Sequence, residues 1–172
     1  MDRRQILELS AALPLGAALA GAAGPARAAE GPSAEVRAAI QDTQSRFVWG
    51  LDNADMAMAA GAFSRDATVR DIEGRLWRPA DGGAPAFLRS AIRAIGPGGS
   101  HYIQLNKLVA KGSAFVATTY WSRLSWTAGA PAPAMQQLGL FTDTFVRDGQ
   151  HLRIAEKVIT RWDSTTVSVA KL

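Results

Sequence analysis

Four long segments with the alternating pattern of β-strands fill the second half of the sequence and predict that a large sheet dominates the fold. Short turns join the segments, and one of them is Asp148-Gly149, a pair that favours a tight hairpin between strands. Long strands joined in this way form an antiparallel meander that must twist and curl. The predicted strands are 101–110, 113–127, 134–147 and 151–163.

The segments before this meander have the periodicity of helices. Apolar residues recur at spacings of three, four and seven over 36–51, which predicts an amphipathic helix. A short Ala- and Met-rich helix is predicted over 54–60, with Asn53 or Asp55 as its cap, and a third helix over 84–95. Helices followed by antiparallel strands predict a single α+β domain, with a cone-shaped, curled antiparallel or mixed sheet packed against three N-terminal helices.

Residues 1–28 have the pattern of an export signal. Arg3-Arg4 begin a basic region and resemble a twin-arginine signal, and 9–24 carries no charge. Ala26-Arg27-Ala28 then offers small residues at the two positions that a signal peptidase reads. An uncleaved membrane anchor is the alternative, but the apolar region is shorter than the roughly 20 residues that span a bilayer. We therefore expect cleavage here and a periplasmic or secreted bacterial protein that meets the membrane only during export.

The expected organisation is an export signal, a linker over 29–35, one cone domain over 36–163 and a C-terminal tail over 164–172. The chain has no cysteine, which excludes disulfides and thiolate catalysis, and its two histidines argue against a zinc site built from histidine. The net charge of +4 is mild and its acids are interspersed, so nucleic acid is not an expected partner. No nucleotide loop, nucleophile elbow or metal motif occurs, and we expect neither a cofactor nor a metal.

A curled sheet with helices on its concave side leaves a cavity, and two ionisable residues are candidates to point into it. His101 begins an apolar row formed by Ile103, Leu105 and Val109 on one face of its strand. It is either a core histidine with satisfied hydrogen bonds or a titrating group tuned by the cavity. Asp52 follows the apolar stripe of the first helix. It either caps the next helix or faces the cavity, where it would suit proton transfer.

Two acidic residues on strands are weaker candidates for the site. Glu156 falls in an apolar row of its strand, and Asp143 alternates with phenylalanines. Ion pairing across the sheet explains both acids better, with Arg123, Arg153 or Arg161 as the partner. Five aromatic residues could line a pocket for a flat apolar ligand, although core packing alone explains them: Trp49, Tyr120, Trp121, Trp126 and Phe141. The candidates for substrate binding are Trp49, Tyr120, Trp126 and Phe141.

The order of several short motifs resembles a known family. Arg46-Phe-Val-Trp-Gly-Leu-Asp52 ends the first helix, and Ser100-His-Tyr-Ile103 opens the first long strand. Residues 62–69 and the hairpin 145–156 complete the pattern, which is similar to a SnoaL-like domain of the nuclear transport factor 2-like superfamily. The resemblance covers about 36–163. It implies the cone fold and leaves function open, because this fold hosts enzymes, binding proteins and scaffolds.

Within that superfamily the sequence most resembles the scytalone dehydratase and polyketide-cyclase type, in which an Asp and a His share acid–base work. Asp52 matches the position of that Asp and His101 the position of the first His. The resemblance thus implies Asp52 as general base and His101 as its partner or as the acid. Two departures stand beside the match: Leu51 occupies the position of a tyrosine, and no second histidine occurs near Trp126.

Two functions follow as alternatives. The first is an exported domain that binds a small, largely apolar or aromatic molecule and catalyses dehydration, isomerisation or cyclisation by proton transfer, as a cofactor-independent lyase or isomerase. The second is a non-catalytic periplasmic module that binds a ligand or serves assembly. In either case we expect a homodimer formed through the outer face of the sheet. There the predicted row of Arg153, Lys157 and Arg161 suits a half-wet interface.

Overall fold

The computed structural model describes residues 31–96 and 98–162. The predicted export signal and the tail over 164–172 lie outside these residues. The elements in chain order are α1 (Ala34–Asp52), α2 (Met56–Ala60), β1 (Phe63–Arg70), β2 (Leu76–Trp77), the 3-10 turn η1 (Pro79–Asp81), α3 (Gly83–Ile95), β3 (Gly99–Lys111), β4 (Ala114–Ser125), β5 (Ala134–Asp148) and β6 (His151–Arg161).

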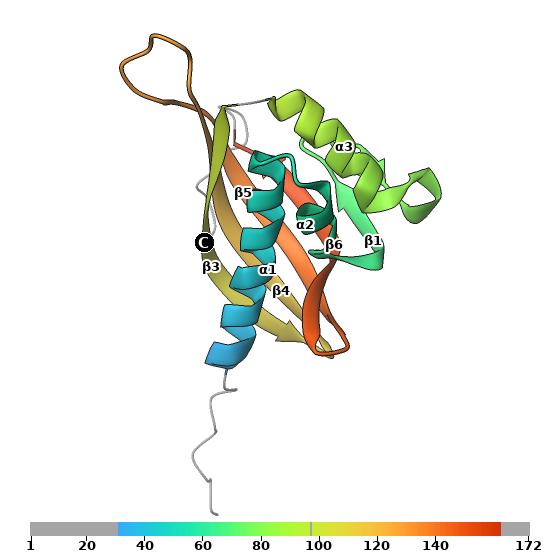
Figure 1. Ribbon diagram of the computed structural model, residues 1–172. Coiled ribbons are helices and arrows are strands. Elements are labelled where there is room, and N and C mark those ends of the chain that lie inside the picture. The colour runs from blue at the N-terminus through green and yellow to red at the C-terminus, as the bar shows by residue number, and fades with distance from the viewer. Residues whose placement is uncertain (1–30, 97, 163–172) are drawn as a thin grey trace, which may run out of the picture.

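The strands form one sheet in the order β2-β1-β6-β5-β4-β3. The pair β1–β6 is parallel and the other pairs are antiparallel, so the sheet is mixed. Figure 1 shows the sheet curling around α1, with α2 and α3 on the same side. This confirms the predicted α+β class. The core fills the space between the helices and the concave face. Its largest fully buried apolar side chains are Phe47, Phe145, Ile40, Leu88 and Ile154.

The first two helices begin at polar caps. The Ser33 hydroxyl accepts a hydrogen bond from the Val36 amide at the start of α1. Asp55, rather than Asn53, caps α2, because its carboxylate accepts from the Met58 amide at 2.9 Å. Asn53 instead donates its side-chain amide to a carbonyl at the end of α1. In the described part of the chain, no helix combines the length and the apolar character needed to cross a membrane.

A β-bulge in β3 changes which side chains face the core. Asn106 is an extra residue in the pairing with β4, so the alternation of inward and outward positions shifts after it. The predicted apolar row from His101 to Val109 is therefore wrong at its far end. Leu108 is buried, whereas Val109 is exposed.

A second bulge in β6 has a larger effect. The pairing with β5 passes over Ala155, so the positions that follow it exchange faces. Glu156 is exposed instead of lying in the apolar row, and Lys157 is fully buried instead of facing outward. The predicted outward row that included Lys157 is thus wrong, because a one-residue shift reverses the faces of a strand.

Gly50 allows α1 and α2 to pack in direct backbone contact just before Asp52. A Cβ atom at this position would lie 2.5 Å from the Ala59 nitrogen and 2.8 Å from its Cα. We expect Gly50→Ala to lower the free energy of unfolding by about 1–3 kcal/mol, because the helices must separate to admit the methyl group. Urea denaturation measures this cost. Gly31→Ala is the control, since a Cβ there meets nothing within 4 Å, and equal effects of the two substitutions would contradict the prediction.

Candidate active site

Asp52 and His101 meet where the end of α1 lies beside the start of β3. His101 Nδ1 lies 2.5 Å from one carboxylate oxygen of Asp52, and the His101 backbone amide donates to the other oxygen at 2.7 Å. Both side chains are largely shielded from solvent, with exposed fractions of 7% for His101 and 12% for Asp52. The structure therefore brings together the two residues that the sequence singles out for acid–base chemistry.

This contact determines which atom of the pair can act on a ligand. The Asp52 carboxylate accepts hydrogen bonds, so Nδ1 is the nitrogen of the neutral imidazole that carries the proton, and Nε2 keeps its lone pair. Both carboxylate oxygens are engaged by His101. His101 lines the adjacent cavity and Asp52 does not. The imidazole is thus the group of the pair that reaches the cavity, and the carboxylate holds it in place.

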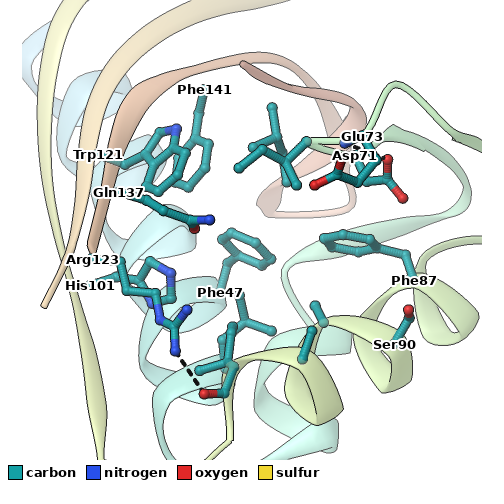
Figure 2. Close-up of a pocket in the computed structure, with 16 residues that line it drawn as sticks. Phe47, Asp71, Glu73, Phe87, Ser90, His101, Trp121, Arg123, Gln137 and Phe141 are labelled. Carbon is teal, nitrogen blue, oxygen red and sulfur yellow. Dashed lines mark hydrogen bonds between the residues drawn. The ribbon is translucent and has the colours of Figure 1, made fainter. Parts of the chain in front are cut away.

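The cavity has a volume of about 270 Å³ and lies between α3, the end of α1 and the concave face of the sheet (Figure 2). This size suits a small molecule with one or two rings. Most of its wall is apolar and comes from Phe47, Leu51, Ile72, Phe87, Ala91, Ala94, Ile95, Trp121, Phe141 and Ile159. The polar and charged lining residues are Asp71, Glu73, Ser90, His101, Arg123 and Gln137.

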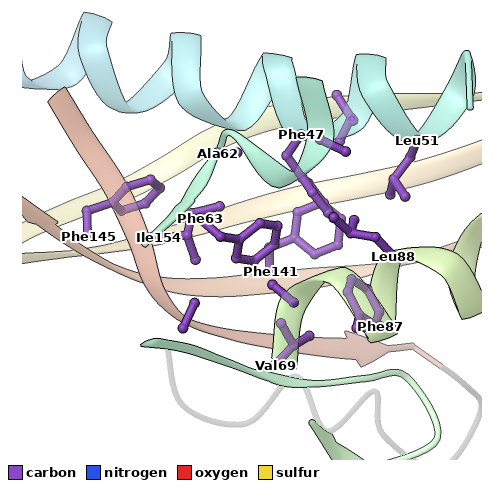
Figure 3. Close-up of a cluster of buried hydrophobic side chains, with 14 of the residues drawn as sticks. Phe47, Leu51, Ala62, Phe63, Val69, Phe87, Leu88, Phe141, Phe145 and Ile154 are labelled. Carbon is purple, nitrogen blue, oxygen red and sulfur yellow. The ribbon is translucent and has the colours of Figure 1, made fainter. Parts of the chain in front are cut away.

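Aromatic rings form one side of the cavity and continue into the core. Trp121 and Phe141 stack with ring centroids 5.5 Å apart and an interplanar angle of 11°. Phe47 meets Phe141 edge-on at 5.9 Å (Figure 3). Trp121 also lies beside the His101 ring, with 6.2 Å between centroids. A flat apolar ligand would therefore find aromatic surface next to the imidazole.

Only one of the four aromatic residues predicted to bind substrate lines this cavity. Phe141 does, whereas Trp49, Tyr120 and Trp126 are exposed outside it. Tyr120 faces the outer side of the sheet, and its inward neighbour Trp121 lies at the cavity instead. A role in binding for the three exposed residues remains a prediction that the cavity does not support.

Five of the six polar lining residues were not identified as site residues from the sequence, and two of these five, Arg123 and Gln137, lie in line with His101. His101 pairs with Arg123 across β3 and β4, and Arg123 pairs with Gln137 across β4 and β5. The three side chains share the concave face and line the cavity. From the sequence, Arg123 was predicted only as an ion-pair partner of an acidic residue across the sheet. The register of the two hairpins is the signal that could have placed it next to His101.

Of the two acids on the opposite side of the cavity, Asp71 has a structural role. One oxygen of Asp71 accepts from the Trp77 indole at 2.7 Å, and the other accepts from the backbone amides of Glu73 and Arg75. Glu73 lies 4.0 Å from Arg161. Asp71 therefore stabilises the turn between β1 and β2. In the described part of the chain, His, Asp and Glu residues nowhere gather in a group of three that could hold a metal ion.

A fully buried ion pair lies against the rings of Phe47 and Phe141 that line the cavity. Lys157 Nζ lies 2.9 and 3.0 Å from the two oxygens of Asp143, and both side chains have no exposed surface. The predicted pairing of Asp143 with an arginine is thus wrong, because the bulge in β6 turns Lys157 inward. Gln44 also donates to Asp143 at 2.9 Å. Burial lowers the pKa of Lys157 below its ordinary value, and the charge of Asp143 opposes this shift.

Comparisons with known proteins agree with this architecture. The model of a family described as a SnoaL-like domain matches residues 32–158. The structure of Aln2 from a Streptomyces species has a TM-score of 0.63 and 21% identity, over 77% of this chain and 94% of that chain. A putative scytalone dehydratase from Novosphingobium aromaticivorans has a TM-score of 0.58 and 15% identity, over 75% and 85% of the two chains.

A third solved structure has the same fold with a different description. The beta subunit of a putative aromatic-ring-hydroxylating dioxygenase, also from Novosphingobium aromaticivorans, has a TM-score of 0.57 and 14% identity, over 75% of this chain and 90% of that chain. None of the curated proteins matches the sequence. At these identities the solved structures show the fold and leave the chemistry to the site itself.

Proposed function

Because this chain belongs to the SnoaL-like domain family, we propose that it binds a small, largely apolar molecule in the cavity and catalyses proton transfer on it. The reaction class is dehydration, isomerisation or cyclisation. The observation that carries the proposal is the His101 imidazole, which Asp52 holds in one orientation at the edge of a cavity lined mainly by apolar side chains. Export by the N-terminal signal is part of the proposal.

The geometry supports an exchange of the roles that the family resemblance implies. His101 Nε2 faces the ligand as general base and returns the proton as general acid, in a step worth about 10²–10⁴-fold. Asp52 acts as a positioning residue, because both its oxygens bind His101. A carboxylate behind an imidazole stabilises the imidazolium that forms when the base takes up a proton.

Deuterium exchange into 1-tetralone, a flat bicyclic ketone, tests this function. The base removes a proton from the carbon next to the carbonyl, the electron pair moves to the oxygen as an enolate, and a deuteron from D₂O returns to the same carbon. We expect saturable exchange in the presence of the protein, followed by proton NMR of the ketone. Exchange no faster than that given by free imidazole at equal concentration, without saturation, would contradict the proposal.

We also propose that two copies of the chain pair through the outer face of the sheet. All three helices cover the concave face (Figure 1), and in the described residues the outer face carries exposed Tyr102, Val109 and Tyr120 with half-buried Leu138 and Leu140. The bulge in β6 turns Lys157 inward and leaves Glu156 exposed, so this face carries less positive charge than the sequence predicts. An uncovered sheet face with apolar side chains favours association.

Tyr120→Glu is expected to shift the protein from dimer to monomer, because it places a charge in the middle of the proposed interface. Light scattering coupled to gel filtration measures the mass. Met58→Glu on α2 is the matched control, since Met58 and Tyr120 have similar exposed fractions of 37% and 38%. A wild-type protein that is monomeric at micromolar concentration, or a Tyr120→Glu variant that stays dimeric, would overturn this part of the proposal.

A further inference from the structure

We infer that the natural ligand of the cavity carries a carboxylate, and that Arg123 binds this group with Gln137 beside it. The inference rests on the proposed function, because it concerns the same cavity, and it narrows the ligand to an acid with an apolar body. Three observations carry it: the position of Arg123 in the wall, the balance of charge around its guanidinium, and the orientation of Gln137.

Arg123 lies between the proposed acid–base residue and a free amide. In the sheet, His101, Arg123 and Gln137 occupy directly paired positions on three neighbouring strands, and all three side chains face the cavity. Neighbouring strands are about 5 Å apart, so the imidazole and the guanidinium lie within the span of a small ligand. Figure 2 shows the three side chains on one wall, around the same open space.

The guanidinium of Arg123 is anchored but has no counter-charge among the described residues. One terminal nitrogen donates to the Ile95 carbonyl at 2.7 Å, and the enclosed Nε has no hydrogen-bond partner. Asp52 is engaged by His101, and Figure 2 shows Asp71 on the far side of the cavity. A charged group in a mostly apolar wall is costly without an opposite charge. A carboxylate on the ligand would supply that charge.

Gln137 adds a second donor at the same place. Its side-chain amide points into the cavity from β5, and it makes no hydrogen bond to any residue that the structure describes. A carboxylate has two oxygens and accepts hydrogen bonds from several donors, so it can engage the guanidinium and the amide together. The apolar body of the ligand would then lie against Phe47 and Phe141, with a carbon near the carboxylate facing His101.

The binding of 2-naphthoate and of its neutral analogue 2-naphthamide tests this inference. Calorimetry on the wild-type protein should show that the carboxylate binds at least about tenfold tighter than the amide, because hydrogen bonds to charged groups are the stronger ones. Arg123→Gln should reduce 2-naphthoate to the affinity of 2-naphthamide. Arg123→Lys keeps the charge and loses the planar fork, and it should retain part of the preference.

Arg65→Gln is the matched control, since it removes the same charge from an exposed position of β1, and it should leave the preference intact. Equal affinities of the two compounds for the wild-type protein would overturn the inference, as would a preference that survives in Arg123→Gln. The wild-type comparison tests the preference for a carboxylate even if that variant does not fold, and Arg123→Lys then tests the part played by Arg123. Binding of neither compound, together with no tetralone exchange, would contradict both the inference and the proposed function.

Tetralone exchange on the same preparation separates the two claims. Exchange without a preference for the carboxylate would contradict the inference alone. A preference for the carboxylate without exchange would contradict the acid–base function and leave the binding site for an acid supported.

Discussion

Replacing Asp143 with asparagine should lower the free energy of unfolding by about 3–5 kcal/mol, because it leaves the Lys157 ammonium buried without a counter-charge. The two side chains are fully buried and in direct contact, and the ammonium also lies over the rings of Phe47 and Phe141 at 4.3 and 3.9 Å. Chemical denaturation followed by circular dichroism measures the loss. Asp42→Asn is the control, since Asp42 forms an exposed pair with Arg46, which contributes at most about 1 kcal/mol.

The double variant Asp143→Leu with Lys157→Met tests whether the loss of stability comes from the unpaired charge or from any substitution at these two positions. It removes both charges while keeping the volume, so it should be far less destabilised than the single variant and close to the wild type. The amide of Gln44 keeps its hydrogen bond to Thr119 in this variant. A single variant no more destabilised than Asp42→Asn would show that the pair is not the buried, coupled unit described above.

The same pair gives stability a defined dependence on pH. Burial lowers the pKa of Lys157 from 10.5, and the charge and hydrogen bond of Asp143 reduce this shift without cancelling it. Between the lowered pKa and 10.5, the unfolded chain binds more protons at this site than the folded protein does. The free energy of unfolding therefore rises with pH across this interval. The double variant lacks the group and should lack this contribution when the two pH profiles are subtracted.

His101→Gln should lower the rate of tetralone exchange by about 10²–10⁴-fold, since it removes the group that carries the proton. The ketone should still bind, because the aromatic wall is unchanged. His151→Gln is the control: His151 is the other histidine of the chain and is exposed at the start of β6. Exchange that persists in His101→Gln at the wild-type rate would exclude His101 as the base.

Asp52→Asn should cost almost as much, for a reason that concerns the tautomer. The amide oxygen of the asparagine would accept from the His101 backbone amide, as the carboxylate does, and its NH₂ group would then donate to Nδ1. The imidazole proton moves to Nε2, which loses its lone pair for catalysis. Nitrogen chemical shifts of His101 measure the tautomer directly. An unchanged tautomer with unchanged activity would contradict the positioning role of Asp52.

The fold could be predicted from local patterns, whereas the pairing of Asp52 with His101 could not. Helical periodicity and strand alternation act over a few residues, so they need no knowledge of tertiary contacts. The contact of Asp52 with His101 joins residues 49 positions apart. The resemblance to a SnoaL-like domain suggested it, and the alternation of residues alone left it open.

The rest of the site depends on the pairing register of the strands, which local sequence patterns do not determine. Arg123 and Gln137 belong to the cavity because two hairpins align them with His101. The partner of Asp143 was missed because a bulge moves Lys157 inward. A prediction by strict alternation takes no account of β-bulges. After each bulge it therefore assigned the following residues to the wrong face of the sheet.

The bulge at Ala155 divides β6 into two parts in which the alternation of inward and outward residues is opposite. Before it, even-numbered residues such as Ile154 face the core, and after it odd-numbered residues such as Lys157 and Ile159 do. Deletion of Ala155 would restore one continuous alternation along the strand. Ile154 and Lys157 would both stay inward, since the one residue left between them would still face out. A change in the length of the strand at this point can therefore alter its bend without exchanging the inward and outward faces of its residues.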